Sequence, residues 1–297
     1  MALRDFALLV LICLVWASNN IVSKFVVSEM DVPPLFYAAV RFLVVAVVVF
    51  PWLRPMPRPR WRLIVVSLLM GGGSFAFTFM GLKLSTPSAA AVVMQLGVPM
   101  TTVLSVLMLG ERIRWRRALG IVLTLAGALA VMWDPHGFRL STGLLFIVLS
   151  SFLGSLGAVM MKQMEGVRPL QFQAWVGVSS FLPLALASAL FEPGQVAAGL
   201  SAGWPFLAAV LFSALVVSVL GHTAYYGLIQ RYEANLISPL TLLTPLATIA
   251  LGVAITHDPF GWRMAIGSAV ALLGVLIIAL RPNQVMPMLL AVRNRVQ

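Results

Sequence analysis

Hydrophobic residues run along this chain in ten long stretches that are uncharged or nearly uncharged, and most charged residues lie in the short gaps between them. A helix that crosses a bilayer needs roughly 20 apolar residues, because no water is present there to satisfy its backbone. The pattern therefore predicts an all-α polytopic membrane protein with ten transmembrane helices. The predicted spans are residues 6–27, 34–53, 63–82, 88–109, 117–133, 143–162, 171–191, 204–228, 235–256 and 264–281.

Composition supports this prediction and leaves no room for a separate water-soluble domain. Of the 297 residues, 61% are hydrophobic and 10% are charged, whereas about a quarter are charged in a soluble domain. The single cysteine, Cys13, lies within the first span, so no intramolecular disulfide is possible. Residues 1–27 have an apolar stretch longer than a typical signal core and no small-residue cleavage site after it, so we expect a retained helix.

The net charge of +11 comes from basic residues between the spans and not from one solvated face, so we expect no nucleic-acid partner. The positive-inside rule places both termini in the cytoplasm, because 15 of the 20 basic residues then lie inside. The inside set is Arg4, Arg54, Arg58, Arg60, Arg62, Arg112, Arg114, Arg116, Arg117, Lys162, Arg168, Arg231, Arg281, Arg293 and Arg295. We expect a multi-pass protein of a bacterial-type inner membrane, ending in a short cytoplasmic basic tail at residues 282–297.

The two halves of the chain are similar to each other, and the matches keep the same order in both. They pair Pro99 and Thr102 with Pro245 and Thr248, Gly120 and Gly127 with Gly267 and Gly274, and residues 32–39 with residues 167–174. Each half, 6–133 and 142–281, contains five spans, and because five is odd the second half enters the membrane from the opposite side. Two inverted five-helix repeats are therefore predicted, an architecture typical of secondary transporters.

Several motifs resemble the EamA half-domain, which builds the ten-helix drug/metabolite transporter superfamily. They are Trp16-Ala17-Ser18-Asn19-Asn20 with Lys24, the Arg41-Phe42 pair, the Pro99 helix that ends at Gly110-Glu111, and the glycine-spaced fifth helix. The resemblance covers nearly the whole chain and is greatest to YddG-type amino-acid exporters. The second half departs from the pattern, because Thr256-His257 stands where Gly110-Glu111 stands in the first.

All nine acidic residues fall at a span end or in a gap. They are Asp5, Glu29, Asp31, Glu111, Asp134, Glu165, Glu192, Glu233 and Asp258. Proton-coupled and sodium-coupled carriers commonly use an intramembrane carboxylate, because such costly groups are kept for function. We therefore expect facilitated, gradient-driven efflux, with proton coupling as the alternative.

Polar side chains inside the spans are the candidates for a substrate cavity. Asn19 and Asn20 either join helices or line a cavity, since a buried amide needs a partner. His222 either hydrogen-bonds between helices, contacts substrate or relays protons. Gln95 and Thr241 occupy equivalent places in the two halves, and Ser155 on the sixth span completes the set.

Pro99 and Pro245 lie four residues after Gln95 and Thr241. A proline removes a backbone donor and opens a helix locally, so each site is either a hinge or a static bend.

Aromatic side chains cluster on the third and eighth spans, where Phe75 and Phe79 are the candidates for an outer gate and Tyr225 and Tyr226 for an inner gate. Ordinary packing or interfacial anchoring is the alternative for both groups. Trp16 is either a cavity wall or a packing residue.

Arg41 is the one charge placed within the body of a span. Snorkelling to the outer surface, or pairing with Glu29 or Asp31, is the favoured interpretation, and attraction of a substrate carboxylate is the alternative. The glycines of the fifth and tenth spans suit close helix packing within the monomer, which we favour, or a dimer contact. The oligomeric state is left open between monomer and homodimer.

These features predict an alternating-access carrier with its site between the halves, lined by spans 1, 3, 4, 6, 8 and 9. The apolar and aromatic pathway favours export of a small zwitterion, as the resemblance also implies: an aromatic or other neutral amino acid, or a related metabolite. A broad-specificity drug or metabolite exporter is the first alternative. An intramembrane enzyme is the remote one, because the spans contain neither paired carboxylates nor HExxH, and GxxxxGK[ST] for ATP is absent. We expect no metal and no cofactor.

Overall fold

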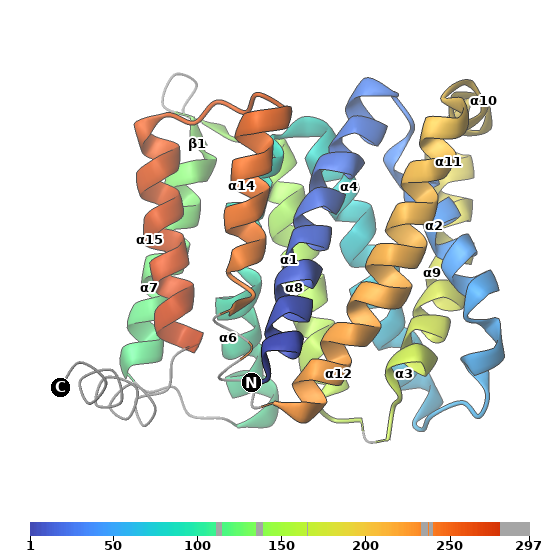
Figure 1. Ribbon diagram of the computed structural model, residues 1–297, viewed down its shortest axis with the longest axis horizontal. Helices are drawn as coiled ribbons and strands as arrows, with labels where there is room; N and C mark the ends of the chain where they lie inside the picture. The colour runs from blue at the N-terminus through green and yellow to red at the C-terminus, as the bar shows by residue number, and fades with distance from the viewer. Residues whose placement is uncertain (111–114, 135–138, 165, 233–236, 238–239, 280–297) are drawn as a thin grey trace.

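The computed structural model describes residues 1–110, 115–134, 139–164, 166–232, 237 and 240–279. Helices standing side by side form nearly all of the regular structure in this part of the chain (Figure 1). Eight of the described helices are long and apolar enough to cross a membrane. Two shorter apolar helices, Pro34–Val48 and Leu243–Ile255, fall in the other two predicted spans. The prediction of a helical polytopic membrane protein is confirmed, while ten spans in inverted repeats stay a prediction.

The helices of the first half follow the predicted spans. They are α1 (Leu3–Lys24), continued by the π-type segment η1 (Phe25–Glu29); α2 (Pro34–Val48) with the 3-10 turn η2 (Phe50–Leu53); α3 (Arg60–Ser67), η3 (Leu68–Gly73) and α4 (Ser74–Leu84), which form one continuous helix; and α5 (Pro87–Met94), α6 (Gly97–Leu109) and α7 (Trp115–Met132).

A small antiparallel ribbon of β1 (Trp133–Asp134) and β2 (Arg139–Leu140) fills the gap before the sixth predicted span. The second half then contains α8 (Thr142–Met161), α9 (Pro169–Phe191), α10 (Gln195–Ser201), α11 (Gly203–Leu211), the π-type segment η4 (Phe212–His222), α12 (Thr223–Arg231), α14 (Leu243–Ile255) and α15 (Trp262–Ala279). The ribbon is a feature that hydropathy alone did not predict.

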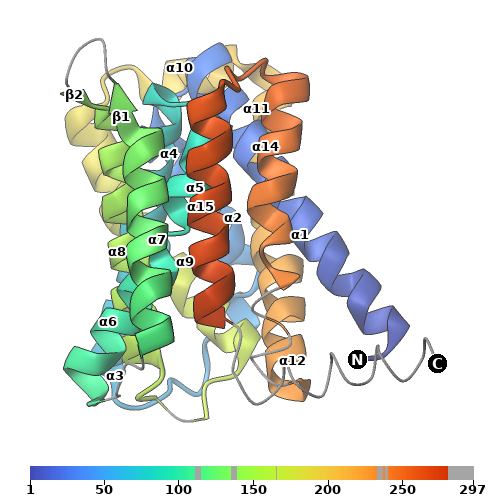
Figure 2. The same ribbon diagram turned by 90° about the vertical axis from the view of Figure 1, so that its left-hand side faces the viewer.

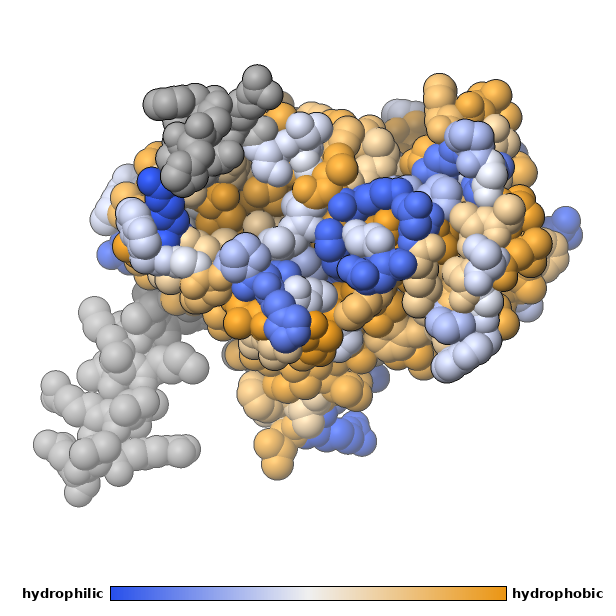
Figure 3. Space-filling model, turned by 90° about the horizontal axis from the view of Figure 1, so that it is seen from above, coloured by the Kyte–Doolittle hydropathy of each residue, from blue (hydrophilic) through white to orange (hydrophobic). Residues whose placement is uncertain are grey.

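The bundle has two distinct ends. We call the end where α1 begins, near α3 and α12, the lower end, and the end with α10 and β1 the upper end (Figure 1). Seen from the upper end, hydrophilic residues gather over the middle of the face and hydrophobic residues surround them (Figure 3). This arrangement is expected of a bundle whose sides face lipid.

α7 and α15 pack against each other along their length (Figure 2). A side chain at Gly120 would bring its Cβ within 2.7 Å of the Gly274 carbonyl oxygen, and one at Gly267 would come within 2.8 Å of Val131. These contacts leave no room for a methyl group. The expected packing of glycines within the monomer is confirmed.

Candidate functional site

Two helices are interrupted four residues before a proline. Because Pro99 has no N–H, the Gln95 carbonyl accepts a bond at 3.1 Å from the residue before the proline, and α5 and α6 separate there. The Thr241 carbonyl accepts the equivalent bond at 3.0 Å ahead of Pro245. The local openings expected at Gln95 and Thr241 are present, and their role as hinges stays a prediction.

A cavity of about 830 Å³ lies beside both interruptions. Its lining comes from both predicted repeats. Of the spans predicted to line the site, spans 3, 4, 6, 8 and 9 contribute residues, and α7 and α15 contribute residues that were not predicted. The polar lining consists of Ser74, Thr78, Gln95, Thr101, Thr102, Ser105, Ser150, Ser151, Ser155, Tyr225 and Thr241, with Arg117 and Lys162.

The cavity is rich in hydroxyl groups and reaches the lower end. Ser105, Arg117 and Lys162 belong to the lower parts of their helices, and the exposure of Lys162 shows where the cavity meets the surface. No acidic residue contributes to the described lining. The space therefore suits a neutral or zwitterionic molecule that accepts and donates hydrogen bonds, entered through a basic mouth.

Four of the predicted site residues meet in this cavity: Gln95, Ser155, Tyr225 and Thr241. Ser155 donates a bond to the Gly97 carbonyl at 2.9 Å and so ties α8 to the interrupted helix. The backbone of Tyr226 lies in α12, and its side chain falls outside the described structure.

Trp16 and His222 lie one layer away from the cavity. The Trp16 ring meets Tyr225 edge-on at 5.0 Å between centroids and lies 5.3 Å from the His222 ring. The His222 Nδ1 is 3.0 Å from the Val217 carbonyl on its own helix, so this bond does not join two helices as one interpretation supposed.

Asn19 and Asn20 both join helices. The Asn19 side-chain oxygen accepts from Ser213 of η4 at 2.6 Å, and the Asn20 amide donates to Thr248 of α14 at 3.3 Å. Neither lines the cavity described above. Of the two interpretations of these amides, the structure shows the interhelical one.

Phe75 and Phe79 pack in the core and do not line the cavity. Phe79 is fully buried and stacks on Tyr37 at 4.5 Å, and Phe75 contacts Phe42 edge-on at 5.5 Å. The neighbouring Ser74 and Thr78 line the cavity instead. α4 therefore presents hydroxyl groups to the cavity and aromatic rings to the core.

The favoured interpretation of Arg41 is wrong. Its side chain is 0% exposed and bonds Ser218 of η4, so it does not snorkel to the outer surface. Asp31 pairs with Lys83 instead, and no ion pair joins Arg41 to any acidic residue of the described structure. Hydropathy placed Arg41 in a span correctly but could not say which way α2 turns it.

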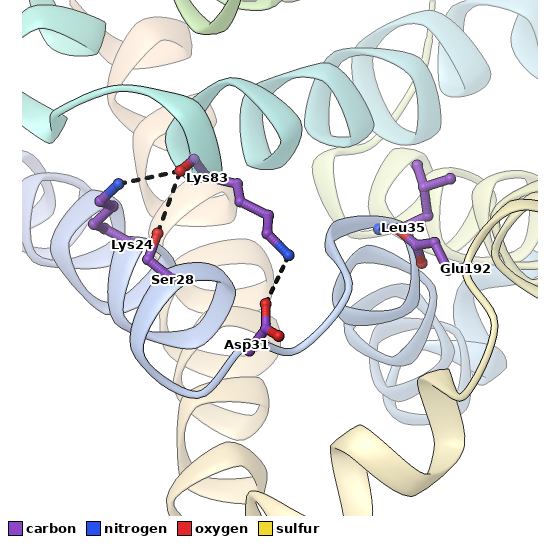
Figure 4. A network of polar contacts seen from close by, with 6 residues as sticks. All are labelled: Lys24, Ser28, Asp31, Leu35, Lys83 and Glu192. Carbon is purple, nitrogen blue, oxygen red and sulfur yellow. Dashed lines mark hydrogen bonds and ion pairs between the residues drawn. The ribbon is translucent and has the colours of Figure 1, made fainter.

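The upper end is closed by polar contacts (Figure 4). Lys24 donates to the Leu82 carbonyl at 2.9 Å, and Lys83 donates to Asp31 at 2.8 Å, which lowers the pKa of the Asp31 carboxyl. The Glu192 carboxylate accepts from the backbone N–H groups of Leu35 and Phe36 at 2.8 and 2.9 Å. These contacts join α1 to α4, and the loop after α9 to the start of α2.

A second carboxylate closes the same end. Asp258 accepts a bond from the Ser88 N–H at the start of α5 at 2.8 Å and one from the Thr256 hydroxyl at 2.7 Å. Sequence reasoning located Glu192 and Asp258 at span ends but assigned them no role. Their positions just before or after a span were the available signal, but their partners lie far along the chain.

Some predicted features lie outside the described residues: Glu111 of the Gly110-Glu111 motif, Arg112 and Arg114, Glu165, Glu233, Arg281 and the basic tail at residues 282–297.

Comparison with known proteins points to one family. A family model described as the EamA-like transporter family matches the chain over residues 5–133 and again over residues 141–280. The two matches fall on the two similar halves of the sequence.

Relatives of known name align with nearly the whole chain. A "probable amino-acid metabolite efflux pump" of Salmonella typhimurium is 26% identical, covering 93% of this chain and 95% of the relative. The Escherichia coli protein of the same name is 25% identical with the same coverage, and a "biotin transporter" of Salmonella typhimurium is 25% identical over 91% of each chain. A crystal structure 20% identical in sequence aligns with a TM-score of 0.64 over 93% of this chain and 96% of the other, which shows similarity of fold.

Proposed function

This chain belongs to the EamA-like transporter family, and on that premise we propose that it exports small metabolites, chiefly aromatic and other neutral amino acids, by alternating access without ATP. Family membership and the efflux pumps among its relatives make it a membrane transporter and not an enzyme. The resemblance to the drug/metabolite transporter superfamily is thereby confirmed. The substrate, the direction of transport and its coupling are the content of the proposal.

The observation that carries the proposal is the cavity, because it is open at one end of the bundle and closed at the other. Basic residues in a loop or at a helix end, among them Arg54, Arg116 and Arg231, lie at the lower end, which we assign to the cytoplasm. On this assignment the cavity faces the cytoplasm, and the proposed conformation is inward-facing.

The proposal includes two inverted five-helix repeats, residues 6–133 and 142–281. It also places the protein in the inner membrane with both termini in the cytoplasm. The matching helix interruptions at Gln95 and Thr241 support it, because both face one cavity. Discontinuous helices at the repeat interface are where secondary transporters bind substrate. Gln95, Ser155, Tyr225 and Thr241 are the proposed substrate contacts, and Pro99 and Pro245 the hinges.

Neutral amino acids fit the cavity by chemistry and size. Hydroxyl groups and an amide line it, none of its described lining residues is acidic, and its volume of about 830 Å³ exceeds that of one amino acid. The names of the two efflux pumps point to the same class of cargo. Facilitated transport is supported because Asp5, Glu29 and Glu192, like Asp31 and Asp258, lie at helix ends or in loops.

A counterflow measurement tests the proposal. Purified protein in proteoliposomes loaded with unlabelled phenylalanine should accumulate labelled phenylalanine transiently, with no ATP and no ion gradient. An imposed pH gradient should leave the extent of uptake unchanged; strong concentrative uptake driven by that gradient would contradict facilitated transport. Absence of counterflow with every neutral amino acid would contradict the proposed cargo.

A second candidate cargo is a carboxylate-bearing metabolite other than an amino acid. The relative named as a biotin transporter favours it, since biotin also ends in a carboxylate. Broad export of metabolites or drugs would appear in the same assay as counterflow with both classes and with cationic compounds.

A further inference from the structure

Arg41 lies in the middle of α2, where every charged group is costly. Its Nε and Nη2 groups donate to the same Ser218 hydroxyl at 3.2 and 2.9 Å, and its guanidinium carbon lies 4.2 Å from the centre of the Phe75 ring. The Nη1 group is buried and has no partner. A hydroxyl and an aromatic face solvate this cation, and one of its donors is left over.

Those contacts do not compensate for the burial of a full positive charge. The free energy gained from a cation–π contact and a neutral acceptor is smaller than the free energy needed to remove a guanidinium from water. A buried guanidinium is therefore normally paired with an anion. No ion pair supplies that anion from the described residues. Arginine is also the side chain whose planar fork matches a carboxylate in two bonds.

A second unpaired donor lies against the same segment, η4. The Trp16 indole N–H is buried without a partner, and a Cβ at Gly221 would be 3.3 Å from its nitrogen. Gly221 follows Ser218 by three residues on η4, so Trp16 and Arg41 contact the same stretch of that segment from α1 and from α2. Both unsatisfied groups are N–H donors, which is what an anionic ligand requires.

This pair of donors adjoins the cavity. Tyr225 lines the cavity and contacts the Trp16 ring at 5.0 Å. On α4, Ser74 lines the cavity, and the ring of the next residue, Phe75, lies 4.2 Å from the Arg41 guanidinium carbon. One aromatic layer therefore separates the open space from the two donors. A molecule that enters from the lower end would reach them by displacing Tyr225 or Trp16.

We propose that Arg41, held in place by Ser218 and assisted by the Trp16 N–H, binds the carboxylate of the transported molecule. The inference rests on the proposed function, because it names the group by which that cargo is recognised. The hydroxyl-lined cavity then receives the remainder of the molecule, and the basic mouth at Arg117 and Lys162 favours entry of a carboxylate.

Matched ligands on the wild-type protein give the first test. Equilibrium binding to the full chain in nanodiscs is measured for L-phenylalanine against L-phenylalaninamide, and for biotin against biotin amide, with chloride as a separate arm. We expect the acid of at least one pair to bind about tenfold or more tightly than its amide. Equal binding of acid and amide, or no binding by either acid, would overturn the proposal, as would chloride competing as strongly as the acids.

Variants then assign the effect to Arg41. Arg41→Gln should weaken binding of the acid by about 10- to 100-fold and leave the amide unchanged, Arg41→Lys should recover part of the loss, and Trp16→Phe should cost about threefold to tenfold. Arg116→Gln, which changes an exposed arginine at the start of α7, should bind like the wild type. An acid preference that survives in a folded Arg41→Gln protein would assign recognition elsewhere.

The two proposals fail separately. Counterflow of phenylalanine together with equal binding of phenylalanine and its amide would leave the proposed function standing and remove the Arg41 site. Binding of biotin but not of its amide, without counterflow of any amino acid, would keep the Arg41 site and replace the proposed cargo.

Discussion

The upper and lower ends of this bundle are made from the same helices but differ in what their polar groups do. At the upper end, Glu192 and Asp258 satisfy backbone N–H groups at the starts of α2 and α5, which belong to the other half of the chain. At the lower end, hydroxyl groups and two basic side chains line an open cavity. When the site switches from opening at the lower end to opening at the upper end, the contacts of Glu192 and Asp258 must break and the lower cavity must close.

The largest effect is expected from filling the lower cavity. Gly154 of α8 lines it, and a tryptophan there would occupy the space between α4 and α8. Gly154→Trp should reduce counterflow by at least about tenfold, because a ligand pocket works only while most of the ligand fits inside it. Phe152→Trp on the same helix is the control, since Phe152 is an exposed position. Equal rates for the two variants would place the transport path elsewhere.

The next largest effect is expected from opening the upper end at Asp258. Asp258→Ala leaves the Ser88 N–H without its acceptor, while the Thr256 hydroxyl keeps the Gly252 carbonyl at 2.8 Å. An orphaned donor costs about 1–3 kcal/mol, which shifts the balance toward an open upper end by about 5- to 150-fold. Asp258→Asn keeps one acceptor oxygen and should shift it less.

Cysteine labelling measures this shift. Cys13 is the only cysteine of the chain and is buried, so Cys13→Ala with Thr78→Cys provides one reporter in the cavity. A membrane-impermeant maleimide added at the upper side should label it faster in the Asp258→Ala protein. Unchanged labelling would show that this carboxylate does not hold the upper end closed.

A smaller change is expected at Glu192. Its two carboxylate oxygens accept from Leu35 and Phe36, and one also accepts from Ser188 at 2.8 Å. Glu192→Gln retains one acceptor oxygen and loses the negative charge at the N-terminus of α2, so we expect about a fivefold shift in the same labelling assay. A larger shift than that of Asp258→Ala would show that Glu192 contributes more than Asp258 to keeping the upper end closed.

The sequence predicted what depends on local pattern. Hydropathy located the helices, and proline and repeat matching located the interruptions at Gln95 and Thr241. Glycine spacing predicted close packing of the fifth and tenth spans within the monomer, although it did not say that α7 and α15 pack on each other. Each is a property of a short segment or of two aligned segments. Gln95, Ser155 and Thr241 were found because polar groups inside apolar spans need a partner or a cavity, and Tyr225 because aromatic residues cluster on the eighth span.

The sequence could not predict which face of each helix points inward, or which residues far apart in the chain form hydrogen bonds. Asp258 and Ser88 are 170 residues apart, and Glu192 and Leu35 are 157 apart, so no local pattern links them. Arg41 was expected near the surface, because hydropathy does not say which face of α2 points inward. The hydroxyl lining at Thr78 and Ser150 was missed for the same reason, although serine and threonine within an apolar span were visible in the sequence.

The smallest effect is expected at the exposed pair of Asp31 and Lys83. Because hydrogen bonding to Lys83 lowers the pKa of Asp31, the contribution of this pair is present above the ordinary aspartate pKa and is lost as the pH falls through the lowered one. Asp31→Asn should therefore change upper-side labelling by no more than about twofold at neutral pH, since exposed ion pairs contribute little. The bond from Lys24 to the Leu82 carbonyl stays in place in this variant and continues to hold α1 against α4. As the pH falls from neutral to acidic, the labelling rate of the wild type should approach that of Asp31→Asn. The labelling rate of Asp31→Asn itself should not change with pH. A shift as large as that of Asp258→Ala would mean that the ion pair, and not the carboxylates bound to helix starts, closes the upper end.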